Sequence, residues 1–151
     1  MKKLLKMGMC IMMAAAILSG CGGNAKTETA VYEGEINGAK ISNTIEYSGD
    51  RVLKQTAVSE MNFKSLGITK TLIEQTVAQY KELYNIEGVN YKADVTDEKI
   101  TETTVVDYEK TDFEALKNAK LITNTKEDGK VLYVSYEQTV KNLESAGLTK
   151  K

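Results

Sequence analysis

The fold of this chain is decided by residues 39–48, AKISNTIEYS, a stretch that alternates apolar and polar side chains between two turn signals. Asn-Gly at positions 37–38 precedes it and Ser-Gly-Asp at positions 48–50 follows it, and both are typical of tight turns. Alternation with a period of two predicts a strand with one buried face. The expected inward side chains are Ala39, Ile41, Ile45 and Tyr47, and the expected outward ones are Lys40, Ser42 and Thr44.

Strands are also predicted on both sides of this stretch. Residues 31–36 precede the first turn, and residues 51–63 alternate again after the second turn. Three consecutive strands joined by tight turns predict an antiparallel meander. In the third strand, the side chains expected to face the core are Leu53, Ala57, Met61 and Phe63.

The apolar period then changes to three and four residues, which predicts an amphipathic helix. Thr69 is the expected N-cap, and Ile68 is placed to pack onto the first turn. The helix is expected to end between residues 85 and 88. Its apolar stripe is predicted to hold Ile73, Val77, Tyr80 and Tyr84, widened by Leu72 and Leu83.

Two further strands, residues 89–95 and 100–108, are predicted around a polar turn at residues 96–99. Thr111 and Glu114 have the spacing of a capping box and predict a short helix after the second of these strands. Residues 131–134 are expected to form a short edge strand, because they are apolar and follow a polar turn.

The last predicted element is a helix over residues 136–146. Ser135 is its expected N-cap, and Gln138 has the spacing that completes a capping box. Gly147 stands where a left-handed residue ends a helix, and Leu148 is placed to fold back onto the last turn as in a Schellman motif.

This order of elements predicts an α+β fold. We expect an antiparallel sheet of about five to six strands, with a long amphipathic helix and a C-terminal helix packed on one face. No repeat or boundary interrupts residues 31–148, so residues 31–151 are expected to form one domain.

The N-terminal stretch has the features of an export signal. An apolar run of twelve residues, 7–18, follows lysines at positions 2, 3 and 6. The run is too short to span a bilayer, which takes roughly 20 residues, and it has the length of a signal-peptide core. Residues 18–21, Leu-Ser-Gly-Cys, resemble the site cut by lipoprotein signal peptidase. The alternative is an ordinary cleaved signal, or an uncleaved anchor, with a chance Cys.

We therefore predict a lipoprotein signal peptide over residues 1–20, cleavage between Gly20 and Cys21, and a lipid on Cys21. Lipoproteins of this class carry a diacylglyceryl group with chains such as palmitate, since one acyl chain alone gives only marginal anchoring. Residues 21–30 are mostly small and polar and are expected to form a flexible tether. The expected location is the extracytoplasmic face of the cell membrane, and the membrane is the first expected partner.

Missing residue types exclude several kinds of chemistry. The chain has no His, and its two Cys fall at positions 10 and 21, one in the leader and one on the lipid. Histidine-based triads, the usual zinc sites and thiol chemistry are therefore excluded, and no catalytic residue, metal or cofactor is expected. Removing the three leader lysines leaves 17 of the 20 basic residues against 21 acidic ones, a balance that argues against a nucleic-acid partner.

Tyrosines are the most distinctive candidates for binding. The chain has eight Tyr, two Phe and no Trp, and Tyr suits contacts that are apolar on one side and wet on the other. Tyr47, Tyr91 and Tyr108 fall on predicted strands, where a shared uncovered sheet face would make a surface for a sugar or a peptide. The alternative is that they serve packing, with the hydroxyl at the rim.

Carboxylates offer the one catalytic alternative. Paired acids can hydrolyse glycosidic bonds, and the candidates are Asp94 or Asp97 with Glu98, and Glu102 with Asp107. Their spacing is not diagnostic, and such residues commonly belong to solvated turns and strand faces.

The whole layout resembles the YehR-like family of small bacterial lipoproteins. The resemblance rests on the lipobox, the short polar tether, the Ser-Leu-Gly-Ile-Thr-Lys segment at residues 65–70 that leads into a helix, and the C-terminal amphipathic helix. It implies one α+β domain on a lipid anchor. The family has no known function, so the resemblance implies no catalytic or ligand residues.

These observations favour a non-catalytic binding module at the cell envelope, with an envelope protein or a small ligand as its partner. Two alternatives stand beside it. One is a carboxylate-dependent hydrolase of an envelope polymer, and the other is a purely structural envelope protein.

Overall fold

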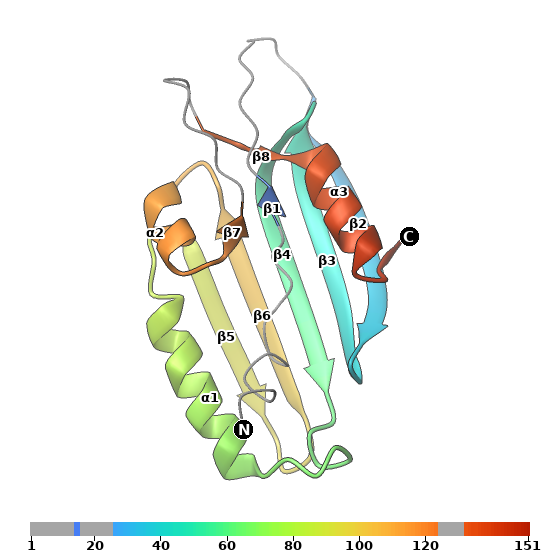
Figure 1. Cartoon of the computed structure of the whole chain (residues 1–151), viewed down its shortest axis with the longest axis vertical. Coiled ribbons are helices and arrows are strands. Elements are labelled where there is room, and N and C mark those ends of the chain that lie inside the picture. Colours follow the sequence, from blue (N-terminus) through green and yellow to red (C-terminus); the bar gives the residue numbers. More distant parts are fainter. Residues whose placement is uncertain (1–13, 16–25, 124–131) are drawn as a thin grey trace.

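The predicted meander forms the centre of the structure. The computed structural model describes residues 14–15, 26–123 and 132–151 (Figure 1). Strands β2 (Glu28–Ile36), β3 (Ala39–Ser48) and β4 (Arg51–Met61) pair antiparallel in chain order. Asn37 and Gly38 take φ of 51° and 79°, the left-handed values that a two-residue hairpin of the primed type requires.

The remaining strands extend this meander on both sides. The hairpin of β5 (Val89–Val95) and β6 (Ile100–Asp107) joins β4 through β6, and β9 (Thr149–Lys150) adds to β2. The sheet order is β5-β6-β4-β3-β2-β9, and β8 (Val134–Ser135) pairs with the start of β4. Separately, β1 (Ala14–Ala15) pairs in parallel with β7 (Ile122–Thr123).

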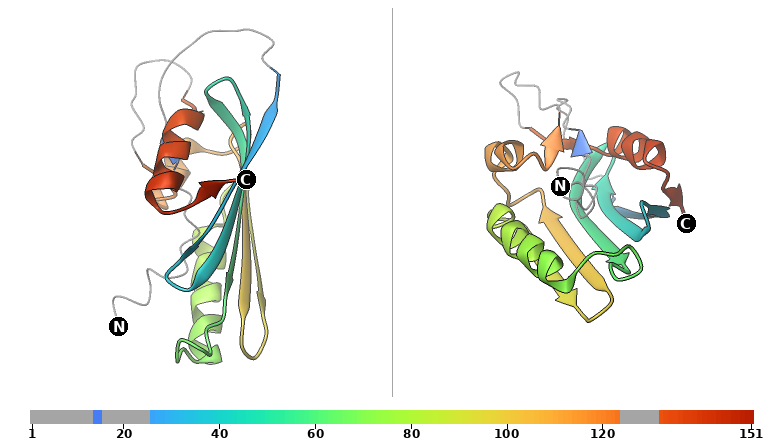
Figure 2. Two further views of the ribbon diagram at one scale, coloured as in Figure 1. Left: turned by 90° about the vertical axis from the view of Figure 1, so that its right-hand side faces the viewer. Right: turned by 60° about the horizontal axis from the view of Figure 1, so that its bottom comes forward.

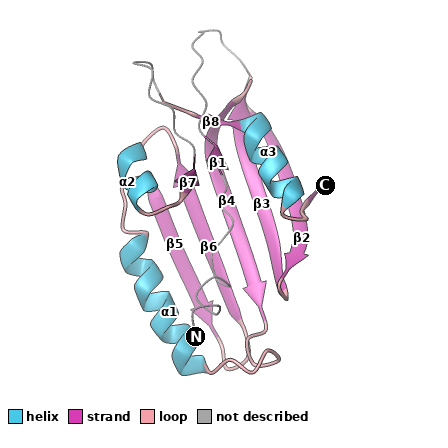
Figure 3. Cartoon of the chain, in the orientation of Figure 1, coloured by secondary structure: helices cyan, strands magenta, loops and turns pink. Residues whose placement is uncertain are grey.

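The helices lie on one side of the sheet. They are α1 (Lys70–Leu83), α2 (Phe113–Asn118) and α3 (Tyr136–Ser145). Figure 2 shows all three on the same side, and Figure 3 shows α1 beside β5 and α3 toward β2 and β3. The α+β architecture with an antiparallel sheet is therefore confirmed, and the two short strands β8 and β9 raise the sheet to seven strands.

The predicted tether is wrong at its C-terminal end. Strand β2 begins at Glu28, and residues 28–30 pair with residues 45–47 of β3. Neighbouring strands satisfy backbone groups that a tether would leave to water, so composition alone could not locate this boundary. Residues 21–25 lie outside the described residues.

The third strand changes its inward face at a bulge. The pairing register shifts between Glu46 and Tyr47, and Leu53 is the extra residue on β4. Val52 is consequently buried and Leu53 is not, which corrects the predicted inward position of Leu53. The bulge carries a tertiary contact, because the Leu53 carbonyl accepts a 2.9 Å hydrogen bond from the Tyr108 amide.

Helix α1 begins where predicted and buries a narrower stripe than predicted. The Thr69 side chain caps it by accepting from the Leu72 amide at 3.3 Å. Ile73, Val77 and Tyr80 are buried on it. Leu72 and Leu83, expected to widen the stripe, are 40% and 41% exposed.

The other helix caps match the predictions in part. Asp112 caps α2 by accepting from the Glu114 amide at 2.8 Å, so the predicted Thr111 capping box is wrong. Ser135 caps α3 as predicted, while the Gln138 side chain donates to Asn142 rather than back to the cap.

The end of α3 is confirmed. Gly147 has φ of 97°, and the Leu148 amide donates to the Leu143 carbonyl at 3.0 Å, which closes the Schellman motif. Of the predicted edge strand at residues 131–134, Val131 lies outside the described residues and Val134 belongs to β8.

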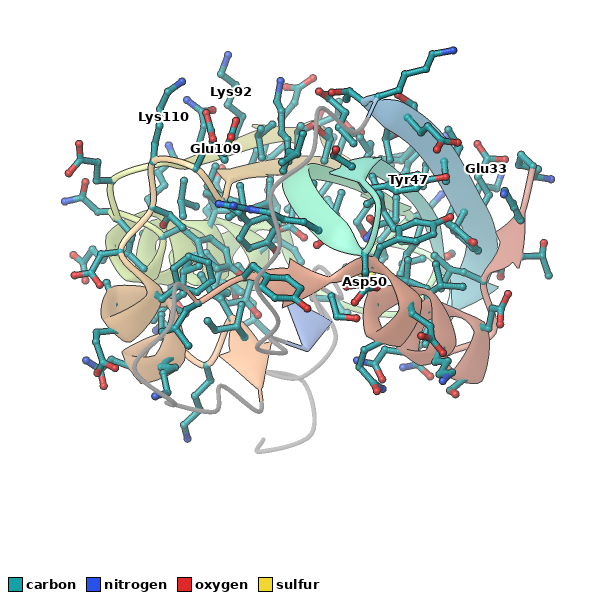
Figure 4. The ribbon with its side chains drawn as sticks, turned by 90° about the horizontal axis from the view of Figure 1, so that it is seen from above. Glu33, Tyr47, Asp50, Lys92, Glu109 and Lys110 are labelled. Carbon is teal, nitrogen blue, oxygen red and sulfur yellow. The ribbon has the colours of Figure 1, made fainter. Side chains whose placement is uncertain are left out.

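Asp50 joins the turn after β3 to the start of α3. Its carboxylate accepts from the Ser135 hydroxyl at 2.9 Å and from the Glu137 amide at 2.8 Å, and its carbonyl accepts from the Tyr136 amide at 2.7 Å. Figure 4 shows Asp50 above α3. The turn therefore supplies a second cap to a helix 85 residues further along the chain.

We expect Asp50→Ala to lower the free energy of unfolding by about 2 kcal/mol, because two charge-assisted hydrogen bonds at a helix start are lost. Asp112→Ala is the matched control, since it removes one local cap, and it should cost about 1 kcal/mol. Urea denaturation of both variants measures the difference. Equal losses would mean that Asp50 contributes no more to stability than a single local cap.

Candidate functional site

The predicted binding tyrosines do not share an uncovered sheet face. Tyr47 stacks on Tyr136 of α3 with ring centroids 3.6 Å apart and planes 7° apart. Tyr108 is buried near Phe113 of α2, and Tyr91 contacts residues of α1. Each ring packs toward a different helix, so the three tyrosines do not form one common surface. Gly20 and Cys21, the predicted cleavage and lipidation residues, lie outside the described residues.

Tyr108 belongs to a buried polar chain that the sequence did not reveal. Its hydroxyl donates to the Gln55 carbonyl oxygen at 2.9 Å, and the Gln55 amide donates to Asn43 at 2.9 Å. Burial raises the pKa of the Tyr108 hydroxyl, so it stays a donor at every physiological pH. These hydrogen bonds satisfy the buried amides, and a structural role explains Tyr108.

Tyr91 lies between the core and the surface. Its ring is centred 6.1 Å from that of Tyr80 and 5.1 Å from that of Tyr84, and its hydroxyl donates to Glu102. Glu102 is only 3% exposed, and burial raises the pKa of its carboxyl while the Tyr91 hydrogen bond partly opposes this. These contacts hold the Tyr91 ring firmly on β5.

A shallow cavity of about 580 Å³ begins at Tyr91. Four of its lining residues are consecutive on β5, and consecutive strand residues point to opposite faces. The cavity therefore follows the edge of β5 and continues onto the face away from the helices, where Figure 4 shows Lys92. The lining residues are Lys81, Tyr91, Lys92, Ala93, Asp94, Thr101 and Thr103.

The edge of β5 directs backbone groups outward. β5 is the end strand of the sheet and pairs only with β6 among the described strands. Hydrogen bonds from the Asp107 amide to the Gly88 carbonyl and from the Thr96 amide to the Lys99 carbonyl fix the alternation of this ladder. By that alternation, the peptide groups of Ala93 and Val95 point away from β6, toward the cavity side of the strand.

Charged side chains border the same edge. Lys81, Lys92 and Asp94 are exposed, and none of them forms an ion pair with another residue in the described ranges. At the β5–β6 turn, by contrast, Lys70 binds Asp97 at 2.8 Å, and this hydrogen bond lowers the pKa of the Asp97 carboxyl. Charged side chains of both signs at this edge are therefore available to contact an external partner.

The structure does not bring Glu102 and Asp107 together. Glu102 is buried on the helix side, whereas Asp107 pairs with Lys110 at 2.8 Å on the other side of the same strand. Asp97 and Glu98 each bind a lysine at the hairpin turn. No group of three potential metal ligands occurs in the described part of the chain.

Glu102→Gln is expected to stabilise the protein at neutral pH. The pKa of Glu102 is raised in the folded state, so the folded protein binds this proton more tightly than the unfolded chain does. The free energy of unfolding therefore falls as pH rises from the ordinary glutamate pKa through the raised one. Glutamine keeps an acceptor for Tyr91 without a charge. Urea denaturation from pH 4 to 8 should show the variant more stable at pH 7 and the gap closing in acid. A constant gap would show that Glu102 does not titrate differently on folding.

Residues 28–149 match the family described as "Protein of unknown function (DUF1307)". The chain belongs to this family. An uncharacterized lipoprotein of Escherichia coli, YehR, is 40% identical over 119 residues, which cover 75% of this chain and 74% of that protein. An uncharacterized lipoprotein of Listeria innocua, Lin0239, is 35% identical over 150 residues, which cover 96% of this chain and 95% of that one. The predicted YehR-like membership is confirmed.

Solved structures agree with this DUF1307 assignment. The NMR structure of E. coli YehR matches with a TM-score of 0.67 at 32% identity, covering 85% of this chain and 93% of that chain. An NMR structure of a Streptococcus pneumoniae protein matches with a TM-score of 0.54 at 14% identity, covering 89% of this chain and 91% of that one, and this likeness shows the fold alone. The lipoprotein names of the relatives support a membrane-anchored DUF1307 protein. Within the described ranges, no helix has the length and hydropathy to cross a membrane.

Tyr91 is the one predicted binding residue of this DUF1307 chain that lines the cavity. The sequence did not single out the other lining residues as binding residues. They are Lys81, Lys92, Ala93, Asp94, Thr101 and Thr103. The alternation of apolar and polar side chains within residues 89–95 and 100–108 predicted both strands correctly. Nothing local to those strands indicates that β5 ends the sheet. The one sequence signal is the Lys-Ala-Asp triplet at residues 92–94, because charge on a strand is typical of exposed edges.

Proposed function

We propose that this chain is a non-catalytic interaction module, held by a lipid on Cys21 at the extracytoplasmic face of the cell membrane, that binds an extended protein segment along β5. The observation that carries the proposal is the cavity along the β5 edge. The lipobox and the lipoprotein names of the relatives support the anchor.

Strand addition is the binding mode that suits this edge. The outward peptide groups of Ala93 and Val95 offer donors and acceptors to an added strand. Main-chain hydrogen bonds would provide affinity, and side chains beside the added strand would provide specificity. Asn90, Lys92 and Asp94 are the exposed side chains on β5, and Lys92 and Asp94 carry the charges that stand next to such a segment.

The scaffold on which this edge lies is firmly held. Glu102 and the rings of Tyr80 and Tyr84 fix Tyr91 from the core side. A rigid strand loses little conformational entropy when a partner binds, so more of the interaction energy is realised as affinity.

In-cell photo-crosslinking of the full-length lipoprotein tests this function. A photoreactive residue at position 94 should form protein adducts, while the same residue at Lys40, exposed on the distant strand β3, should not. Ala93→Pro should abolish the adducts, because it removes an outward N–H while leaving the pairing with β6 intact. Adducts of equal yield at both positions, or adducts that survive Ala93→Pro, would count against binding at this edge.

A further inference from the structure

We infer that the segment bound at the β5 edge is β5 of a second copy of this chain, paired antiparallel about a two-fold axis at Ala93. This inference rests on the proposed function and names the partner at the same edge. Its basis is that the charges of β5 complement those of a second β5 in one register and conflict in the neighbouring ones.

Backbone geometry limits the registers that are available. The outward peptide groups belong to odd-numbered residues such as Ala93 and Val95, so an added copy must place odd residues opposite odd ones. Even-numbered residues, including Lys92 and Asp94, then also face each other across the new pair. They occupy the non-hydrogen-bonded positions, where side chains approach most closely.

Side-chain charge then selects among these registers. With Ala93 opposite Ala93 of the second copy, Lys92 lies opposite Asp94 of that copy, and by symmetry the pair occurs twice. In the next available register on one side, Lys92 lies opposite Lys92 of the second copy. In the next available register on the other side, Asp94 lies opposite Asp94. Opposite charges directly across a sheet stabilise the pairing of the two strands, whereas like charges destabilise it.

The helix-side residues fit the same register. Tyr91 lies opposite Val95 of the second copy, an aromatic and β-branched pair that stabilises antiparallel sheets. Ala93, the smallest residue of β5, lies on the axis where two identical side chains must meet. Lys81 of α1 borders the cavity that the second strand would enter.

A lysine on an edge strand often prevents strand addition, because burying its charge beside a neutral strand is unfavourable. Here Asp94 follows two residues later on the same face, so an antiparallel copy supplies the opposite charge. Lipid anchoring would raise the local concentration of such copies and favour a short interface.

Charge exchange tests the pairing in the full-length lipidated protein, reconstituted in detergent micelles and followed by analytical ultracentrifugation. Wild type should dimerise reversibly. Lys92→Asp alone and Asp94→Lys alone should each weaken dimerisation by about tenfold or more, because two attractive pairs become repulsive. The double variant should dimerise like wild type, and an equimolar mixture of the two single variants should form heterodimers. Both positions are exposed, and matching circular dichroism and urea midpoints confirm that the variants fold.

Two outcomes would overturn the inference: a wild type that stays monomeric at every concentration, or single variants that dimerise as well as wild type. Either result, combined with position-94 adducts to a different protein in cells, would leave the proposed function standing and reject only the second copy as partner. A monomeric wild type without any position-94 adduct would reject both.

Discussion

Cys21→Ala should move the protein entirely from the membrane fraction to the soluble fraction and abolish its labelling by an alkyne fatty acid. Residue 21 is the predicted site of the diacylglyceryl group, and each buried methylene of an acyl chain contributes about 0.8 kcal/mol to membrane binding. Without that group the mature chain, cleaved of residues 1–20, keeps no predicted membrane contact. Cell fractionation and in-gel fluorescence measure the two effects.

Cys10→Ala is the matched control for this experiment. Both substitutions remove one thiol, but residue 10 lies within the predicted leader and should leave anchoring and labelling unchanged. A Cys21→Ala protein that is still cleaved and still sediments with membranes would reject the lipobox.

Gly88→Ala should be the most destabilising of the substitutions to alanine proposed for the domain. We expect the free energy of unfolding to fall by about 3 kcal/mol or more. Gly88 has φ of +78°, and a Cβ there would lie 2.8 Å from the Thr111 amide nitrogen and 2.9 Å from its Cα. A left-handed conformation costs an L-residue about 1–2 kcal/mol, and overpacking against backbone adds about 1–3 kcal/mol. The Gly88 carbonyl also accepts from the Asp107 amide at 2.8 Å, so displacement would disturb the start of the β5–β6 pairing.

Gly49→Ala separates these two costs. Gly49 has φ of +59° and has open space around the added Cβ, so only the conformational cost of about 1–2 kcal/mol applies. Urea denaturation of both variants should therefore show a clearly larger loss for Gly88→Ala. Equal losses would mean that the loop at Thr111 moves away freely and that the close approach is not important for stability.

Local signals in the sequence predicted most elements well. The strand at residues 39–48 matches β3 at both ends. Thr69 and Ser135 cap the starts of helices and Gly147 follows the end of one, as expected. Period-two alternation, caps and left-handed glycines depend on neighbours within a few residues, so they can be read from one chain. The error at Leu53 arose at a bulge, and the errors at Leu72 and Leu83 arose because the packing of α1 decides which of its side chains are buried.

The candidate site was predicted less completely, for a related reason. Tyr91 was predicted as a binding residue and lines the cavity, whereas Tyr47 and Tyr108 pack against helices. A tyrosine on a strand can face a helix, solvent or a partner, and its residue type is the same in each case. Only the positions of α1 and the end of the sheet separate these environments.

The lipobox pattern, the sites of the turns and caps, and the α+β class can be read from the order of the amino acids alone. Three features follow only from long-range contacts: β6 joins β4, β5 ends the sheet with its Lys92 and Asp94 exposed, and Asp50 holds α3. The two groups of features differ in how far apart along the chain the interacting residues lie. Turns, caps and alternation follow from interactions within a few residues, whereas strand order and edges follow from hydrogen bonding and burial among segments that are distant in the chain.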